Sequence, residues 1–242
     1  MEHLPCQVRD MIHVTRVIGP IEQTMKTTTG EVESKPRNSR VREVTGRRIL
    51  DAATHVFTQK GFADATIAEM VQRSEVARGT FYLYYTDKRA VFDALVQQVT
   101  EDLYKVAVPP ESVGSYRERI RRATGSYLDV FTRHAGVISC IFEVATSDRE
   151  INRLQNGYRE KFRKRIEAHF DRNVRAGTFR DIDPRTASYC LCAMIEGTAY
   201  EWSCTNYKPW GKSQQGLEKL ADTLTDIWCR YVEPEAEEGK RG

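Results

Sequence analysis

The chain has 242 residues, 40% of them hydrophobic, so it is long enough for one large core or for a small domain joined to a bigger one. Its net charge of +3 is mild, so a basic surface for nucleic acid must be local. No uncharged apolar run reaches about 18 residues, and charges interrupt the start, so neither a transmembrane helix nor a secretory signal is expected. We therefore expect a cytoplasmic protein without membrane association.

Motifs that would indicate catalysis or metal binding are missing from the sequence. It contains no GxSxG, HExxH, Walker or GxGxxG pattern, so an enzyme is not expected. The six cysteines lack the CxxC and Cys/His spacings of zinc sites. Cys190 and Cys192 lie two apart in a helical pattern, where they cannot chelate one ion together. We expect reduced thiols, no metal and no cofactor.

Residues 1–44 show no sustained hydrophobic period and predict a disordered basic arm. Around its end, six basic residues accompany a single acid, Glu43; they are Lys35, Arg37, Arg40, Arg42, Arg47 and Arg48. Such an arm can lie in the minor groove of DNA. It can equally be a solvated end, or lie upstream of a true start at Met25, and the sequence leaves these alternatives open.

The first expected helix runs from Thr45 to Lys60, where apolar residues recur at helical spacing. Gly61 follows it in the position of a left-handed C-terminal cap. Thr66 and Glu69 form a capping box that opens a short second helix, which ends near Ser74. Another short helix directly after this one would complete a helix-turn-helix, with the longer first helix to pack against.

The stretch ARGTFYLYYTDK, Ala77–Lys88, begins this second short helix, and Thr86-Asp87 caps the next helix, which runs to about Leu103. In a helix-turn-helix the second short helix enters the major groove of DNA. There Arg78 can reach a base edge, and Gly79 lets the backbone come close to the duplex. Hydroxyl groups and one lysine can hold phosphates, namely those of Thr80, Tyr82, Tyr84 and Lys88.

Aromatic residues at helical spacing are more often core than contact surface. Phe81 and Tyr85 lie four apart on one face, and we expect them to pack inside the protein. Tyr82 and Tyr84 share their faces with the polar Thr86 and Lys88. We therefore expect these two tyrosines to face the DNA.

The pattern stays helical beyond a break at Pro109-Pro110, and no segment alternates with the period of a strand, so the chain is expected to be all-α. The later expected helices are Tyr116–His134, Val137–Ser147, Arg149–Ala176, Pro184–Cys204 and Gln215–Val232. We expect a helix-turn-helix DNA-binding domain at 45–105, a larger helical domain for ligand binding and dimerisation at 111–232, and a disordered charged tail at 233–242.

The span Thr45–Leu103, and especially TIAEMVQRSEVARGTFYLYYTDKRAVFDAL, resembles the DNA-binding domain of the TetR family of transcriptional regulators. The resemblance implies a homodimeric, ligand-responsive regulator, usually a repressor, with a ligand cavity among its middle helices and dimerisation through its last two. It also implies DNA contacts at Thr66, Arg78, Gly79, Thr80, Tyr82, Tyr84 and Lys88. Two positions depart from the commonest pattern: Glu75 stands where glycine is frequent, and Ala77 replaces a frequent serine cap, at about 1 kcal/mol each.

A continuous apolar stripe on the expected helix Arg149–Ala176 indicates core packing and leaves Arg159 and Arg163 on other faces. A ligand cavity among the helices would be lined by apolar residues and a few polar groups. The polar candidates, each more often a packing residue than a contact, are Tyr127, His134, Glu143, Tyr158, His169 and Glu196. The expected ligand is a small apolar or amphipathic inducer. The sequence names neither this ligand nor the operator, and it does not distinguish repression from activation.

The last two expected helices carry more large apolar residues than their own packing requires. Pairing with a second copy in a four-helix bundle would bury this surface. The predicted interface residues are Leu191, Trp202, Leu224 and Trp228. Such a homodimer would read an inverted repeat in double-stranded operator DNA. A helical adaptor without DNA binding also fits these helices, but it leaves Arg78, Tyr84 and Lys88 unexplained.

Overall fold

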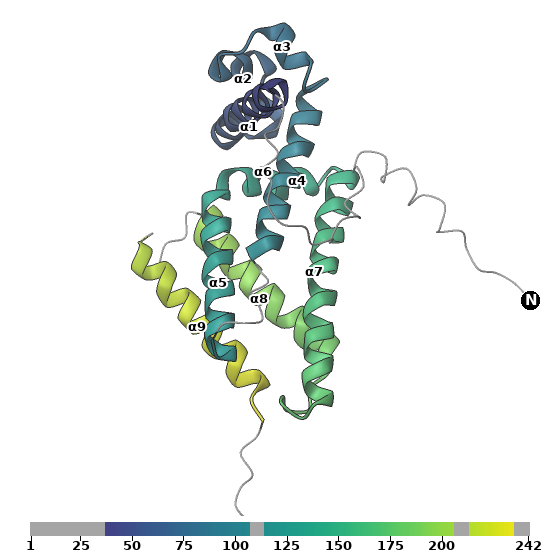
Figure 1. Ribbon diagram of the computed structural model, residues 1–242, viewed down its shortest axis with the longest axis vertical. Coiled ribbons are helices and arrows are strands. Elements are labelled where there is room, and N and C mark those ends of the chain that lie inside the picture. The colour runs from purple at the N-terminus through teal and green to yellow at the C-terminus, as the bar shows by residue number, and fades with distance from the viewer. Residues whose placement is uncertain (1–36, 107–113, 206–212, 235–242) are drawn as a thin grey trace, which may run out of the picture. The chain divides into compact units, whose positions relative to one another are not determined.

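The computed structural model describes residues 37–106, 114–205 and 213–234, and their regular structure is entirely helical (Figure 1), which confirms the all-α prediction. The helices are α1 (Arg37–Asp64), α2 (Ile67–Ser74), α3 (Arg78–Tyr82), α4 (Lys88–Val106), α5 (Tyr116–Arg133), α6 (Ala135–Ala145), α7 (Arg149–Arg175), α8 (Pro184–Cys204) and α9 (Gln214–Val232). None of these helices is long and apolar enough to cross a membrane. The chain divides into residues 1–40 and 41–242, and the packing described below lies within the second unit.

The first helix begins at Arg37 and not near Thr45, which corrects the expected extent of the arm. The segment from Arg37 to Val44 contains neither proline nor glycine, so nothing in it stops a helix from extending backwards. Val41 and Val44 are each 60% exposed, so this part of α1 adds no buried face. The hydrophobic period therefore marks where α1 becomes buried, and not where it begins. The rest of the expected arm, and residues 235–242 of the expected tail, lie outside the described residues.

Caps and a glycine set the ends of the N-terminal helices. Gly61 has the left-handed φ that its position predicts (φ 73°, ψ 179°), but helical backbone resumes after it and runs to Asp64. The capping box of α2 is present, because Glu69 N donates to Thr66 Oγ1 over 3.3 Å and Thr66 N donates to Glu69 Oε2 over 3.2 Å. Asp87 caps α4 by accepting a backbone N–H over 2.8 Å. The local sequence signals thus place the helix-turn-helix correctly.

The N-terminal helices α1, α2 and α3 gather around the first half of α4, which continues into the group formed by α5–α9 (Figure 1). One core cluster runs through both groups and includes the fully buried Phe57, Phe81 and Phe92. The rings of Phe57 and Phe92 pack edge to face with their centroids 5.3 Å apart. A second cluster joins α7, α8 and α9 around Phe170 and Trp228. Because the first cluster is continuous, the two groups of helices share a core.

Candidate functional site

The turn between α2 and α3 has the geometry that its sequence predicts. Glu75 is left-handed (φ 52°, ψ 32°), and among the described residues it alone combines a side chain with a positive φ. Its carboxylate accepts a hydrogen bond from Arg48 Nη2 over 3.1 Å. Ala77 is the N-cap of α3 and offers no side-chain hydrogen bond. Both departures from ideal capping are therefore real and weaken the turn locally.

Helix α3 buries one face and exposes the other. Phe81 is fully buried, and burial raises the pKa of the half-buried Tyr85, so both aromatic residues pack inside as expected. Arg78 and Gly79 lie on the exposed side, and Tyr82 is 43% exposed. The Arg78 guanidinium lies 6.0 Å from the centre of the Tyr82 ring. The outward face thus presents one cation, one phenol and bare backbone.

Gly79 has no packing reason to be glycine. A Cβ added there would have no heavy atom of the rest of the protein within 4 Å, and its φ lies in the ordinary helical range. Glycine inside a helix costs roughly 0.5–1 kcal/mol relative to alanine. The missing side chain therefore does not serve the fold, and it leaves the α3 backbone open to a partner outside the protein.

Two of the predicted contact residues are partly occupied within the protein. Tyr84 is half-buried against α1, where its Cε1 would lie 3.4 Å from a Cβ on Gly46, so the ring has a packing role that the sequence did not indicate. The exposed Thr66 uses its hydroxyl in the α2 cap, and Oγ1 also donates to Glu69 Oε2 over 2.8 Å. Thr80 is half-buried on α3. DNA contacts by these three residues stay predictions.

Lys88 has an intramolecular role that its interpretation as a phosphate contact did not include, and the phosphate contact stays a prediction. Its Nζ donates to the carbonyl oxygens of Phe62 over 2.7 Å and Ala63 over 2.9 Å, and it lies 4.8 Å from the centre of the Phe62 ring. These carbonyls follow the break at Gly61, where the α1 ladder is interrupted. The ammonium group of Lys88 has three N–H groups, and two of them join the end of α1 to the start of α4.

Leu83 is an outward-facing residue that the sequence reading missed. It is 78% exposed at the C-cap of α3, directly beside Tyr82. The available signal was its position two residues after the buried Phe81, which turns it away from the core face of a helix. An exposed leucine on this face can contact the methyl group of thymine.

A cavity of about 430 Å³ lies among α4, α5, α6, α7 and α8, with Trp228 of α9 at its edge. Of the predicted ligand contacts, Tyr127, Tyr158, His169 and Glu196 line it. Arg159 Nε donates to Glu196 Oε1 over 2.8 Å and to Oε2 over 3.0 Å. Burial, reinforced by the Glu196 charge, raises the pKa of Tyr127 far above its ordinary value. The cavity volume falls within the range of small-molecule sites.

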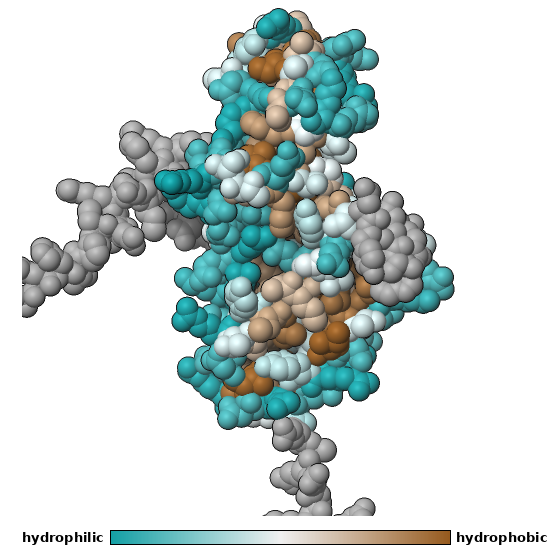
Figure 2. All heavy atoms as spheres, turned by 180° about the vertical axis from the view of Figure 1, so that it is seen from behind, coloured by the Kyte–Doolittle hydropathy of each residue, from teal (hydrophilic) through white to brown (hydrophobic). Residues whose placement is uncertain are grey.

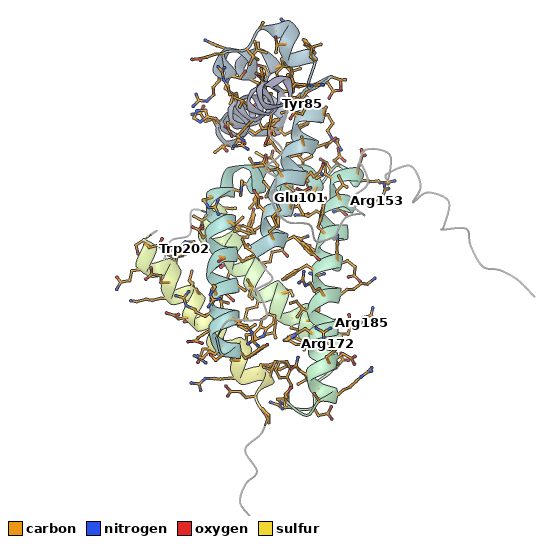
Figure 3. All side chains as sticks on the ribbon, viewed as in Figure 1. Tyr85, Glu101, Arg153, Arg172, Arg185 and Trp202 are labelled. Atoms are coloured by element: carbon orange, nitrogen blue, oxygen red, sulfur yellow. The ribbon has the colours of Figure 1, made fainter. Side chains whose placement is uncertain are left out.

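His134 and Glu143 are not among the residues that line the cavity, so it gives no support to these two predicted ligand contacts, which stay predictions. His134 stands at the junction of α5 and α6, 3.4 Å from Asp102, and burial lowers the pKa of its ring. Glu143 is exposed on α6 and faces Gly61 of α1. Five arginines that were not among the predicted ligand contacts line the wall, namely Arg119, Arg159, Arg163, Arg165 and Arg172. Figure 3 shows Arg172 near the C-terminal end of α7.

The predicted dimer-interface residues are buried inside the protomer. Leu191, Trp202, Leu224 and Trp228 are only 4–7% exposed, so they have almost no surface left for a partner. Trp228 Nε1, for example, donates to Tyr116 Oη over 2.8 Å. The surplus of apolar residues on these helices fills the core of the protomer itself. The side chains of α8 and α9 that remain accessible lie on the outward faces of these helices, and the interface stays a prediction.

A different set of uncharged residues covers that outward side. On α9 the half-buried Leu220 is followed at helical spacing by the exposed Ile227 (45%) and Tyr231 (40%). On α8 Cys190 and Gly197 are exposed, and a Cβ on Gly197 would meet nothing within 4 Å. Figure 2 shows hydrophobic residues gathered over this side of the molecule. The apolar side chains on this outward surface of α8 and α9 give an exposed apolar area that a second copy could cover.

Comparison with known proteins covers both groups of helices. Residues 49–95 match the family model described as bacterial regulatory proteins, tetR family, and residues 113–232 match the tetracyclin repressor-like C-terminal domain. A Bacillus subtilis HTH-type transcriptional regulator, YdgC, is 25% identical over 67% of this chain and 83% of its own length. The TetR-family regulator PfmR from Thermus thermophilus is 19% identical and superposes with a TM-score of 0.59 over 77% of this chain and 99% of its own. The flavonoid-responsive regulator FrrA is 19% identical, with a TM-score of 0.55 over 80% of this chain and all of its own.

The structural role of Lys88 is testable without DNA. We expect Lys88→Ala to lower the free energy of unfolding by about 1 kcal/mol, because two carbonyls lose a charged hydrogen-bond donor at a partly exposed site. The measurement is urea denaturation followed by circular dichroism. Lys219→Ala, at an exposed position of α9, is the control and should change stability by less than about 0.5 kcal/mol. Equal stability of the two variants would contradict the assignment.

Proposed function

As a member of the TetR family of bacterial regulatory proteins, this chain is a DNA-binding transcriptional regulator, and we propose that it is a repressor that a small-molecule inducer releases from its operator. The observation that carries the proposal is the outward face of α3. There the bare backbone at Gly79 stands between Arg78 and the exposed Tyr82, with no packing reason for the glycine. Close approach of the backbone to a duplex supplies that reason.

Each exposed residue of α3 has a proposed part in reading DNA. Arg78, at the N-terminal end of α3, reads a base edge, for which guanine is the commonest partner. Leu83 contacts a thymine methyl group, and Tyr82 bonds a phosphate through its hydroxyl. Further phosphate contacts are proposed for the hydroxyls of Thr66, Thr80 and Tyr84. Lys88 is proposed to stabilise this surface through its hydrogen bonds to the carbonyl oxygens at the end of α1.

A homodimer is proposed to form through the outward surface of α8 and α9 that carries Ile227 and Tyr231. One short recognition helix reads too few bases for a specific site, whereas two related by a twofold axis read two half-sites. The exposed Ile227 and Tyr231 give this surface an apolar centre. The expected operator is therefore an inverted repeat in double-stranded DNA.

The inducer is proposed to occupy the cavity among α4–α8. Its volume of about 430 Å³ and its mixture of apolar walls with a few polar groups suit a small apolar or amphipathic molecule. The similar fold of FrrA, described as flavonoid-responsive, supports a regulator of this architecture that answers to a small molecule. By linkage, inducer and operator must weaken each other's binding by the same factor, typically about 5 to 150-fold.

Selection of bound sequences from random DNA duplexes tests the proposal. We expect enrichment of an inverted repeat, and we expect its affinity to fall steeply as salt rises because phosphate contacts release counterions. A purely helical adaptor would enrich nothing. Enrichment of a single half-site without its inverted repeat would contradict the proposed dimer but would still show DNA binding.

Replacement of Gly79 separates its proposed DNA role from any role in folding. Gly79→Ala should raise the free energy of unfolding by roughly 0.5–1 kcal/mol, because alanine is the better helix former. The same change should weaken binding to the selected duplex about tenfold, because the new methyl group stands where the backbone meets the DNA. Denaturation and fluorescence anisotropy give the two quantities.

Gly157→Ala is the matched control for this experiment. Gly157 is also a helical glycine, lies on α7 and would place its Cβ in open space. We expect the same gain in stability and no change in DNA affinity. Unchanged DNA binding by Gly79→Ala would remove the glycine from the reading surface.

The corrected dimer surface gives a further prediction. The double variant Ile227→Glu with Tyr231→Glu should sediment as a monomer and bind the operator poorly, because charges would enter an apolar interface. Its helicity and melting should stay close to the original protein, since both side chains are exposed in the protomer. Glu218→Lys, on the opposite side of α9, should remain dimeric. A dimeric double variant would move the interface elsewhere.

A further inference from the structure

The wall of the cavity carries a strong excess of positive charge. Among the described residues that line it are five arginines and a single carboxylate, Glu196. Glu196 is bonded to Arg159 through Nε, which leaves the N–H groups on both Nη atoms of that arginine for other partners. The remaining four arginines of the wall are Arg119, Arg163, Arg165 and Arg172. Within this wall, cations therefore outnumber anions by four.

Aromatic rings, and not carboxylates, hold most of these arginines. The guanidinium carbon of Arg163 lies 4.5 Å from the centre of the Tyr189 ring. The same pairing joins Arg119 with Tyr116, Arg159 with Phe142 and Arg165 with Tyr104, over 5.9, 5.1 and 5.8 Å respectively. A ring supports the flat face of a guanidinium and leaves its edge free to bind a carboxylate or phosphate in two-point fashion. Except for Arg159, which also pairs with Glu196, these cations are thus positioned without being neutralised by an acid.

Arginines elsewhere in the described chain are commonly neutralised by acids. Eight of them form ion pairs with aspartate or glutamate: Arg47, Arg48, Arg89, Arg117, Arg121, Arg133, Arg175 and Arg230. Acids on α7 are likewise used outside the cavity, Glu160 by Lys164 and Asp171 by Arg175. Of the five arginines in the described part of the cavity wall, only Arg159 forms such an ion pair, so an anion is a partner that the other four lack.

Arg163 and Arg159 form the centre of this positive wall. They lie four residues apart on α7, so their side chains occupy the same face, and both are half-buried. Like charges at this spacing destabilise a helix, and the carboxylate of Glu196 pairs with Arg159 and not with Arg163. An anionic group between the two guanidinium groups would relieve their repulsion and accept charge-assisted hydrogen bonds from both.

Apolar side chains form a large part of the remaining wall, so an inorganic anion alone would leave that part of the surface unmatched. Phe131, Ile138 and Ile141 are buried and line it from α5 and α6. Ile166 and Ile195 add apolar surface from α7 and α8. Such a surface gains free energy by covering a hydrocarbon or aromatic body.

We propose that the ligand of this cavity is an amphipathic organic anion, whose carboxylate or phosphate group binds Arg163 and Arg159 and whose apolar body lies against the isoleucine and phenylalanine wall. The inference rests on the proposed function, which it deepens by fixing the sign of the ligand's charge. Glu196 competes with the ligand for Arg159 and so sets an upper limit on how tightly the anion is held. The anionic head group of the ligand would therefore lie beside the carboxylate of Glu196, which already binds Arg159.

Binding of matched amphiphiles to the full chain tests this assignment by isothermal titration calorimetry. The probes are dodecanoate, dodecyl phosphate, 1-dodecanol and dodecylammonium, each below the concentration at which it forms micelles. We expect at least one of the two anions to bind about tenfold or more tightly than the alcohol, and the cation to bind most weakly. The tighter of the two anions identifies the head group. Equal binding of alcohol and anions, preference for the cation, or failure of both anions to bind would overturn the proposal.

Three variants connect the preference to named side chains. Arg163→Gln should weaken anion binding about tenfold and leave dodecanol unchanged, whereas Glu196→Gln should strengthen anion binding by removing the competing carboxylate. Arg153→Gln is the matched control, an exposed arginine near the other end of α7 from Arg172 (Figure 3), and it should bind all four probes as the original protein does. Equal anion affinity of Arg163→Gln and Arg153→Gln would remove Arg163 from the site. Thermal melting of each variant checks that the fold is intact.

The same protein distinguishes this proposal from the function on which it rests. Calorimetry reads the charge preference without DNA, and the duplex selection reads DNA binding without ligand. Anion preference without DNA binding would leave the cavity assignment standing and remove the repressor function. DNA binding without anion preference would do the reverse.

Discussion

Arg89 links α4, which follows the helix-turn-helix α2–α3, to α7, which forms part of the cavity wall. From the first turn of α4, its guanidinium pairs with Asp93 on the same helix over 2.7 Å, with Asp148 at the N-cap of α7, and with Glu150 over 3.2 Å. Asp148 also caps α7, and the backbone amide of Ile151, with Arg89 second, holds the pKa of that carboxyl below its usual range. One side chain therefore ties the start of α4 to the start of α7. Under the proposed function, a ligand that moves α7 acts on α4 through this cluster.

A close local contact joins α1 to α6. A Cβ on Gly136 would lie 2.2 Å from Thr58 Oγ1, so only glycine lets the two helices approach this closely. Nearby, Cys140 Sγ donates to the carbonyl oxygen of Phe57 over 3.2 Å. Tightly packed contacts of this kind shift as units and do not deform gradually. Thr58 and Phe57 of α1 are thus held against Gly136 and Cys140 of α6.

Features fixed by neighbouring residues could be predicted from the sequence, and features fixed by tertiary contact could not. The Thr66–Glu69 capping box of α2 and the Asp87 cap of α4 depend on residues within one turn, and both are present. The role of Lys88 could not be read, because its partners Phe62 and Ala63 lie 26 and 25 residues away. Apolar content likewise revealed that α8 and α9 need covering, but not whether the protomer or a second copy covers them. The cavity arginines were missed for the same reason, since only the fold shows that aromatic rings, and not acids, stand beside them.

In the helix-turn-helix formed by α2 and α3, the residues that lower local stability lie in the turn and on the exposed side of α3. Three positions within five residues depart from the best local choice: Glu75 in a left-handed conformation, Ala77 as an N-cap without a side-chain acceptor, and Gly79 inside a helix. Each costs roughly 1 kcal/mol in local stability. The fully buried Phe81 offsets part of that cost by anchoring α3 to the core, since burying such a side chain contributes about 1.5–3 kcal/mol. A helix of only five residues held by one aromatic anchor keeps its outer surface free of packing demands, and that freedom allows residues there to be chosen for a partner outside the protein.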